Sequence, residues 1–261
     1  MILVLSGTND GRLVVENLLN EGYQIIVTTA TDLGATLMEG HDHMAVVVGR
    51  LNGAEIKNFI MEKKIRLVID ATHPFAVEVS DNAMAACEEV GIQYLRFQRN
   101  ACNVEEYLNQ VIRAEDYEDA AKKLRDIEGN ILLTTGSKSL EIFAEALDVK
   151  RLFPRILPMG NGISKCEGLG FSTANIIAMQ GPFSQEMNEE IIKKYNIKIL
   201  VTKESGVTGG VDCKLKAAEK LNIAVMVIDR PKQKFSNIVH SVDELIGKVR
   251  ELYGSLLSHN D

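Results

Sequence analysis

The stretch MILVLSGTNDGR, residues 1–12, decides the fold. A short apolar run leads at once into a turn with two glycines, and a segment with helical spacing of its apolar residues follows. A buried strand that passes through such a turn into a helix opens a parallel α/β sheet, and the helix N-terminus can bind a phosphate. The spacing is G-x-x-x-G rather than G-x-G-x-x-G, so a plain helix cap at Thr8, Asn9 or Asp10 also fits.

Apolar runs of strand length recur along the chain and alternate with segments of helical period. In the first hundred residues these runs are 2–5, 24–28, 45–48, 67–69 and 92–95. In the second half they are 130–134, 151–153, 174–179, 197–202 and 223–228, with a closing helix over 241–257. The pattern predicts an α/β protein of two Rossmann-like lobes with parallel sheets. We expect a nucleotide-binding lobe over 1–100, a helical connector over 101–128 and a substrate-binding lobe over 129–261.

Length and composition exclude several classes of protein. A chain of 261 residues with 46% apolar and 25% charged residues is an ordinary globular protein of one large or two small domains. Its net charge of −7 argues against a nucleic-acid partner or an anionic membrane surface. The four cysteines lack metal-ligand spacing, and no window reaches the ~20 apolar residues of a membrane span. We therefore expect reduced cysteines, no metal site, no membrane partner and a cytoplasmic location.

The end of the second apolar run is the next candidate for nucleotide binding. In a dinucleotide-binding lobe this point faces the adenosine ribose, where an acidic residue selects NADH. The sequence has Thr28 and Thr29 there, which would tolerate the 2′-phosphate of NADPH, and Arg12 or Arg50 could meet its charge. Asp32 is near enough to leave the choice between NADPH and NADH open.

A histidine follows the fourth apolar run, in the stretch DATHPF at residues 70–75. Pro74 fixes the turn behind it, and the carboxyl end of a central strand is where ligands enter such sheets. His73 could donate a proton or a hydrogen bond near neutral pH. The alternative is a histidine that bonds Asp70 or the backbone and only holds the loop in shape.

Two loops of the second half combine glycine, hydroxyl and lysine at strand ends. Gly136, Ser137 and Lys138 follow one run, and residues 203–206 follow another. Backbone N–H groups and an ammonium that converge on one space form an anion site. A solvated lysine is the alternative for each loop, and neither loop is a Walker motif.

Motifs that occur in order over almost the whole chain point to one family. They are SGTNDGR (6–12), VGRL (48–51), IDATHPFA (69–76), YLRFQR (94–99), TGSK (135–138), FPRILP (153–158), QGPFS (180–184), TKESG (202–206) and RP (230–231). With these motifs the sequence resembles the precorrin-6A reductases of cobalamin biosynthesis, including the cobalt-precorrin-6A reductases. It departs from the family pattern at Asn9-Asp10, where a variable residue and glutamate are usual, and at Asn100, where proline is usual.

The resemblance implies reduction of one double bond of a tetrapyrrole macrocycle by NADPH or NADH, which gives precorrin-6B or its cobalt form. It also implies that cofactor and substrate share a cleft between the lobes. We assign the cofactor to Gly7, Thr8, Asn9, Asp10, Gly11, Arg12, Thr28, Thr29, Arg50, His73 and Pro74, with His73 as the catalytic candidate. We assign the substrate carboxylates to Gly136, Ser137, Lys138, Lys203, Glu204, Ser205 and Gly206. Further cations at strand ends are Arg96, Arg99, Arg155 and Arg230.

Two other functions compete with this one. A short-chain-type dehydrogenase that acts on a small carbonyl would need a Tyr-x-x-x-Lys pair, which the sequence lacks. A non-catalytic NAD(P)-binding sensor would need no reactive group at all. Oxidation of the nucleotide upon addition of the tetrapyrrole separates an enzyme from a sensor, because a sensor turns nothing over.

Overall fold

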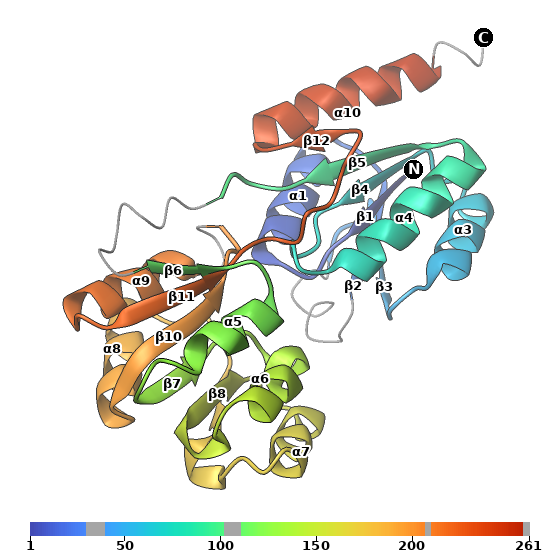
Figure 1. Cartoon of the computed structure of the whole chain (residues 1–261). Helices are drawn as coiled ribbons and strands as arrows, with labels where there is room; N and C mark the ends of the chain where they lie inside the picture. Colours follow the sequence, from blue (N-terminus) through green and yellow to red (C-terminus); the bar gives the residue numbers. More distant parts are fainter. Residues whose placement is uncertain (30–39, 102–110, 207–209, 258–261) are drawn as a thin grey trace. The chain divides into compact units, whose positions relative to one another are not determined.

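The chain folds into two compact α/β units. The computed structural model describes residues 1–29, 40–101, 111–206 and 210–257. Unit 1 consists of Met1–Asn100 and Lys232–Asp261, and unit 2 consists of Ala101–Pro231. Each unit contains a six-stranded sheet whose described strand pairs are all parallel (Figure 1). The predicted α/β fold with two parallel sheets is confirmed.

The sheet of unit 1 has the strand order β12-β5-β4-β1-β2-β3. Its strands are β1 (Ile2–Leu5), β2 (Ile25–Thr29), β3 (Met44–Val48), β4 (Leu67–Asp70), β5 (Gln93–Phe97) and β12 (Ile238–Val239). The strand order reverses between β1 and β4, because the chain runs outward from β1 through β2 to β3 and then returns to β4. In open α/β sheets, ligands bind at the carboxyl ends of the strands that flank such a reversal.

Helices cover both faces of this sheet, which explains why its central strands are apolar on both sides. On one face α1 (Asn9–Asn20) and α10 (Val242–Leu257) pack against Ile2 and Val4. On the other face α3 (Gly53–Glu62) and α4 (Val77–Val90) pack against Leu3 and Leu5 (Figure 1). The alternation of side chains along β1 therefore divides its residues between two cores.

Unit 2 repeats this plan with the order β6-β11-β10-β7-β8-β9, which reverses between β7 and β10. The strands are β6 (Val111–Ala114), β7 (Asn130–Leu133), β8 (Leu152–Ile156), β9 (Ile177–Ala178), β10 (Ile197–Lys203) and β11 (Ala224–Ile228). The helices are α5 (Tyr117–Leu124), α6 (Leu140–Ala146), α7 (Gly160–Gly168), α8 (Gln185–Lys194) and α9 (Val211–Lys220), with short 3₁₀ turns η2 (Ser137–Ser139), η3 (Val149–Arg151) and η4 (Thr173–Asn175). Ile191 of α8 and Leu215 of α9 share a core with Phe153 and Leu200 of the sheet.

The predicted boundaries of the lobes are wrong at two places. Residues 232–261 do not belong to the second unit, because β12 pairs with β5 and α10 contributes Leu245 and Val249 to the core of unit 1. The 101–128 segment is not a purely helical connector, because its residues 111–114 form β6 beside β11. In each unit the first strand after the chain passes from one unit to the other, β6 in unit 2 and β12 in unit 1, lies at the edge of the sheet (Figure 1).

The other predicted runs agree with the observed strands to within a few residues, and the closing helix is present as α10. In the described part of the chain, no helix combines the length and the apolar character that a membrane crossing requires.

Candidate functional site

The candidate loops of both units lie where the strand order reverses. In unit 1, the turn after β1 and the His73 loop after β4 flank the reversal. In unit 2, the Gly136 loop after β7 and the Lys203 loop after β10 flank it. The sheet topology alone therefore directs two pairs of sequence-predicted loops to the ligand-binding ends of their sheets.

The turn between β1 and α1 is built by a threonine cap. Thr8 Oγ1 accepts a hydrogen bond from the Gly11 N–H at 2.9 Å and donates one to the Ala71 carbonyl at 3.0 Å. The second bond ties this turn to the loop after β4. Gly7 has φ 138°, a backbone conformation that residues with a Cβ rarely adopt. Thr8 is thus the helix cap among the three predicted candidates.

Gly11 is required for the close packing of this turn. A Cβ built on Gly11 would lie 2.1 Å from Ser6 Oγ and 2.9 Å from Ser6 Cβ. The Ser6 Oγ is itself buried and has no hydrogen-bond partner among the described residues. A buried hydroxyl beside the first turn of a helix, with no Cβ in the way, suits the phosphate of a nucleotide.

The charged residues of α1 pair with each other and with a neighbouring loop. Asp10 forms an ion pair with Arg99, with 3.1 Å between Asp10 Oδ1 and Arg99 Nε. Arg12 donates a hydrogen bond to the Asn9 side chain. Since Arg99 is already paired with the Asp10 carboxylate, its main role is to hold the turn in shape.

The end of β2 lies beside this turn. Thr28 and Thr29 are buried, and the Thr28 carbonyl accepts the hydrogen bond of Ser6 N–H at 3.0 Å. Arg50 is exposed just beyond β3. Asp32, the residue that left the choice of nucleotide open, lies outside the described residues.

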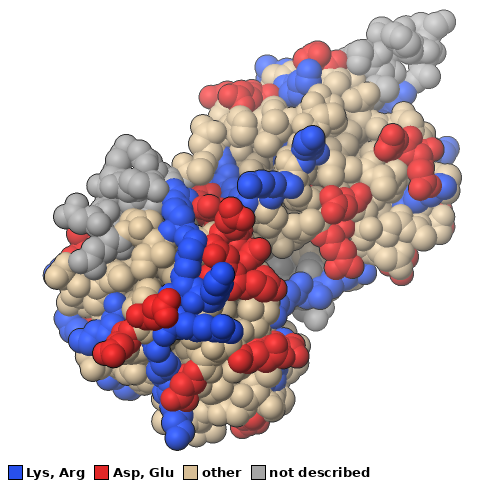
Figure 2. Space-filling model, in the orientation of Figure 1, with Lys and Arg blue, Asp and Glu red and all other residues tan. Residues whose placement is uncertain are grey.

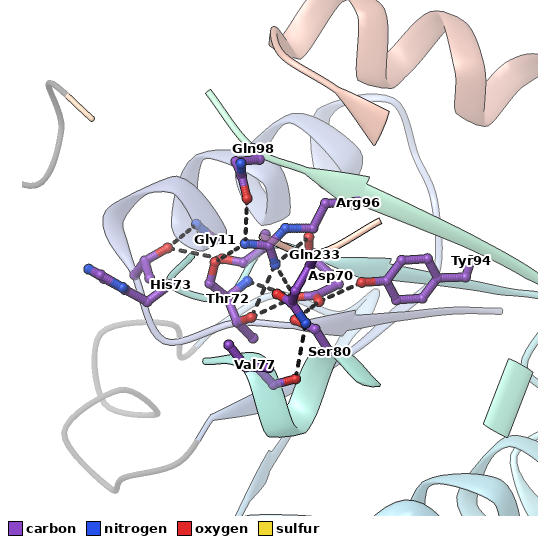
Figure 3. A network of polar contacts seen from close by, with 12 residues as sticks. Gly11, Asp70, Thr72, His73, Val77, Ser80, Tyr94, Arg96, Gln98 and Gln233 are labelled. Atoms are coloured by element: carbon purple, nitrogen blue, oxygen red, sulfur yellow. Dashed lines mark hydrogen bonds and ion pairs between the residues drawn. The ribbon is translucent and has the colours of Figure 1, made fainter. Parts of the chain in front are cut away.

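A polar network that saturates the Asp70 carboxylate supports the loop after β4 (Figure 3). Asp70 Oδ1 accepts from Arg96 Nη1 at 2.6 Å and from the backbone and hydroxyl of Thr72 at 2.9 and 2.7 Å. Its Oδ2 accepts from Ser80 Oγ at 2.6 Å and from Tyr94 OH at 2.7 Å. Arg96 Nη2 also donates to the Thr72 carbonyl at 2.9 Å. Burial, with the charge of Asp70, raises the pKa of Tyr94, so this phenol stays a donor.

His73 follows directly on this network. Its Nδ1 accepts from the Phe75 N–H at 3.2 Å, and its carbonyl accepts from the Ala76 N–H at 2.8 Å. The neutral ring therefore carries its proton on Nε2. The hydrogen bond to Nδ1 matches the alternative in which the backbone holds this histidine, while Nε2 is the atom through which a ligand role would operate.

The loop after β7 turns sharply at Gly136, which has φ 84°, and continues into η2. Ser139 Oγ donates to the buried Thr135 Oγ1 at 2.8 Å and fixes this turn from below. Ser137 is half-buried, and Lys138 is exposed. Ser137 and Lys138 thus follow this turn at the carboxyl end of β7.

Glu204 shapes the loop after β10 from within. It is 2% exposed, its Oε1 accepts from the Gly206 N–H at 3.0 Å, and its Oε2 forms an ion pair with Arg230. Glu204 therefore holds the loop in shape. Its buried carboxylate is not a group that would bind the carboxylates of a substrate. Lys203 and Ser205 on either side of it are half-buried.

Two further cations stand at this end of unit 2, and the sequence pointed to only one of them. Arg155 of β8 is 6% exposed, donates to Asn188 Oδ1 at 2.8 Å and stacks on the Phe183 ring at 4.0 Å. Lys214 of α9 donates to Thr202 Oγ1 at 3.2 Å, which places its ammonium beside the end of β10. Lys214 was missed because α9 carries several lysines and the sequence does not show which one turns inward.

Burial and mutual repulsion weaken the basicity of these groups. Burial, with the charges of Arg155 and Lys203, lowers the pKa of Lys214 to about 7, although neighbouring Cys213 opposes this. Burial and the charge of Lys138 lower the pKa of Lys203 to about 8, and burial lowers the pKa of Arg155 to about 10. Shifts of this kind are enriched at functional sites.

The structure changes the interpretation of three predicted cations. Arg96 is 1% exposed and is held by Asp70, so it cannot bind an external carboxylate. Arg230 and Arg99 are ion-paired with Glu204 and Asp10. The regular spacing of charges at strand ends could have indicated the first pair, because Asp70 and Arg96 are register partners on β4 and β5.

The fold and these loops define a protein of Rossmann-like class, with a phosphate-compatible turn in unit 1 and a basic site in unit 2. A family model described as precorrin-6x reductase CbiJ/CobK matches residues 1–250. The chain belongs to this family, which confirms the resemblance seen in the sequence. It is therefore an oxidoreductase of cobalamin biosynthesis, and neither competing function is favoured.

Individual relatives agree with the family model. The cobalt-precorrin-6A reductase of Priestia megaterium is 38% identical over 250 residues, which cover 94% of this chain and 96% of that protein. The cobalt-precorrin-6A reductase of Methanothermobacter thermautotrophicus is 32% identical, with 96% and 85% covered. A solved structure of CobK precorrin-6A reductase superposes with a TM-score of 0.80 at 24% identity and covers 96% of both chains, which supports the fold.

Proposed function

We propose that this chain reduces one double bond of cobalt-precorrin-6A with NADPH and yields the cobalt form of precorrin-6B. The observation that carries the proposal is the family match over residues 1–250, together with relatives named cobalt-precorrin-6A reductase at up to 38% identity. The cobalt form of the substrate rests on the names of those relatives. The residue assignments rest on the geometry of the loops.

The turn from Gly7 to Arg12 would hold the phosphates of the nucleotide. Gly7 and Gly11 leave the backbone N–H groups of the first turn of α1 unobstructed, and a bound phosphate would also favour the positive end of the helix. Thr8 keeps the turn in place through its bond to the Ala71 carbonyl. Asn9 and Asp10 complete the turn, and Asp10 acts through its pair with Arg99.

The proposed preference for NADPH rests on the residues at the end of β2. Thr28 and Thr29 present no carboxylate there, so a 2′-phosphate meets no repulsion from these residues. Arg50 is exposed close by and Arg12 is half-buried, so both could neutralise that phosphate.

His73 and Pro74 would border the nicotinamide, which when bound supplies a hydride to the macrocycle. Asp70, Arg96 and Thr72 hold the backbone in front of His73, and His73 presents Nε2–H. Hydride transfer depends on distance and orientation, so a rigid loop contributes by placing the reactants. We expect His73→Ala to slow the single-turnover hydride step more than it weakens nucleotide binding; a wild-type rate would remove His73 from catalysis.

The basic loops of unit 2 would hold the acetate and propionate groups of the macrocycle. Gly136, Ser137, Lys138, Lys203 and Ser205 would supply N–H, hydroxyl and ammonium donors at the ends of β7 and β10, and Gly206, with φ 74°, would supply the turn of the second loop. Glu204 would act by shaping this loop, since its carboxylate binds the Gly206 N–H and Arg230. A cleft shared with the nucleotide stays a prediction.

The test is anaerobic turnover by the full chain. We expect oxidation of NADPH with cobalt-precorrin-6A, slower oxidation of NADH, and slower reduction of metal-free precorrin-6A. Absence of nucleotide oxidation with either macrocycle would refute the proposed reaction. Equal rates with both nucleotides would refute only the preference for NADPH, and faster reduction of the metal-free form would reverse the choice of substrate.

A further inference from the structure

Two strongly desolvated cations of unit 2 lie outside the sequence-predicted substrate loops. Arg155 lies on β8 and Lys214 on α9, outside both loops. Several surface cations of unit 2 are neutralised by acidic neighbours, as in the pairs Lys123–Asp119 at 2.6 Å and Arg113–Asp229 at 2.8 Å. Figure 2 shows this mixture of basic and acidic side chains over one face of the unit. Among the described residues, no carboxylate forms an ion pair with Arg155 or Lys214.

Strand alternation puts Arg155 and Lys214 on one side of the sheet. Phe153 and Leu200 belong to the core beneath α8 and α9. Arg155 and Thr202 each stand two residues further along the same strands, so their side chains point to the same face. Lys214 reaches that face from α9, where its ammonium bonds the Thr202 hydroxyl at 3.2 Å. Two cations from separate elements thus lie close enough at the carboxyl end of the sheet for the charge of Arg155 to act on Lys214.

The partners of both cations in the protein are neutral. In the described part of the chain, Arg155 donates to an amide oxygen of Asn188 and rests on the Phe183 ring, and Lys214 donates to a hydroxyl. Asn188 is fully buried and also donates to the Ser184 carbonyl at 2.7 Å, so its oxygen is held toward Arg155. A fixed guanidinium beside an ammonium is suited to an oxyanion, since their remaining N–H groups can converge on it.

We propose that Arg155 and Lys214 form an anion subsite of unit 2 that binds one carboxylate of the macrocycle. The subsite rests on the proposed function, and it adds a point of substrate recognition beyond the loops after β7 and β10. A bound carboxylate neutralises the repulsion between the two cations and fixes one edge of the macrocycle.

Binding of this carboxylate is coupled to proton uptake. The groups that face Lys214 are Arg155 of β8, Lys203 of β10 and neighbouring Cys213. Since the pKa of Lys214 is about 7 in the free protein, a large fraction of this side chain is neutral above neutral pH. An anion in contact with it raises that pKa, so binding takes up a proton and the affinity falls as pH rises above neutral.

The experiment compares Lys214→Gln and Lys214→Arg with a matched control. The control is Lys216→Gln. Lys216 lies on the same helix, and its exposed ammonium pairs with Asp212 at 2.8 Å. Calorimetric titration with cobalt-precorrin-6A, without nucleotide and without oxygen, gives the affinity, and a separate titration with NADPH tests the fold of each variant. We expect Lys214→Gln to bind the macrocycle about tenfold to a hundredfold more weakly, with Lys214→Arg and Lys216→Gln close to wild type and NADPH binding unchanged in all.

Proton uptake supplies the second measurement. Titrations near pH 8 in buffers of different ionisation enthalpy give the protons bound with the macrocycle, and Lys214→Gln should take up fewer than wild type and Lys216→Gln. Unchanged macrocycle affinity and proton uptake in Lys214→Gln would overturn the subsite even if the wild type turns over. Weakened NADPH binding in place of macrocycle binding would overturn its assignment to a carboxylate of the macrocycle. A wild type that neither binds nor reduces the macrocycle would refute the proposed function as well.

Discussion

Two groups of buried charge lie at the carboxyl ends of strands, one in each unit, and they are neutralised to different degrees. At the end of β4 in unit 1, Arg96 meets Asp70 at 2.6 Å, and three neighbouring side chains complete the bonds of that carboxylate. At the ends of β8 and β10 in unit 2, Arg155 and Lys214 have only neutral hydrogen-bond partners in the described part of the chain. The strand ends of unit 1 thus carry a neutralised pair, whereas those of unit 2 carry, besides the Glu204–Arg230 pair, two cations with no carboxylate partner among the described residues.

This difference indicates two roles for buried charge: the pair in unit 1 positions a loop, and the cations of unit 2 are suited to binding a ligand. The Asp70 pair satisfies its own charges, so it can hold the loop in front of His73 without a ligand. The cations of unit 2 repel each other and are poorly solvated, which costs stability in the free protein. Proteins retain such costs at sites of function, and in the proposed subsite a carboxylate of the macrocycle would remove the cost.

The largest effect is expected from removal of Asp70. Asp70→Ala leaves the Arg96 guanidinium buried without its counter-charge, and we expect a loss of about 3 to 5 kcal/mol in the free energy of unfolding. Urea unfolding of the whole chain measures it. The exposed Asp42 offers the control, since Asp42→Ala should change stability by less than about 0.5 kcal/mol. Equal stability of Asp70→Ala and wild type would contradict a neutralising role for Asp70.

A smaller effect is expected at the nucleotide turn of unit 1. In Gly11→Ala the new Cβ collides with Ser6, which should cost about 1 to 3 kcal/mol of stability and weaken NADPH binding by distorting the turn. The matched control is Gly247→Ala in α10, where a Cβ meets nothing within 4 Å. That variant should be slightly more stable, by about 0.5 to 1 kcal/mol, with normal NADPH binding. Normal NADPH binding in a folded Gly11→Ala would remove the turn from the nucleotide site.

The smallest effect, of opposite sign, is expected from Lys214→Met. Near neutral pH this change removes a desolvated charge from beside Arg155, so the free protein should be as stable as wild type or slightly more stable. Urea unfolding near pH 7 measures it. A loss of several kcal/mol would show that Lys214, like Asp70, serves stability.

The pH dependence of stability sharpens the same contrast. Lys214 titrates at about 7 in the folded chain and near 10.5 in the unfolded one. Between these values the unfolded state binds more protons, so the stability of the wild type should rise with pH, by at most about 1.4 kcal/mol per pH unit from this group. Lys203 contributes in the same direction. Urea unfolding over this range should give a smaller slope for Lys214→Met, and an identical slope would contradict the lowered pKa.

Much of the fold was predictable because central parallel strands are apolar on both faces and stand out as short runs. The two missed strands lack this signal: β6 contains Arg113 within four residues, and β12 is two residues long. Their edge positions demand less burial, and only strand pairing shows which sheet receives each of them. This is also why the boundaries of the lobes could not be predicted.

The candidate loops were predictable from glycine, hydroxyl and charged residues at the ends of strands. The partner that each charged side chain bonds in the fold was not predictable. Arg96 and Arg155 are both strand arginines in the sequence, yet one is held by Asp70 and the other by Asn188. The difference depends on which neighbour shares the sheet face, and that is a property of register and helix packing. Lys214 was hidden for the same reason, since helical spacing does not reveal which lysine turns toward a strand end.

The most direct test of the division of labour compares two variants with two ligands. Equilibrium dissociation constants for NADPH and for cobalt-precorrin-6A would be measured on Gly11→Ala and on Lys214→Gln. The account predicts a crossed pattern, in which the first variant loses affinity for the nucleotide alone and the second for the macrocycle alone. Loss of both ligands in each folded variant, or the reverse pattern, would contradict it.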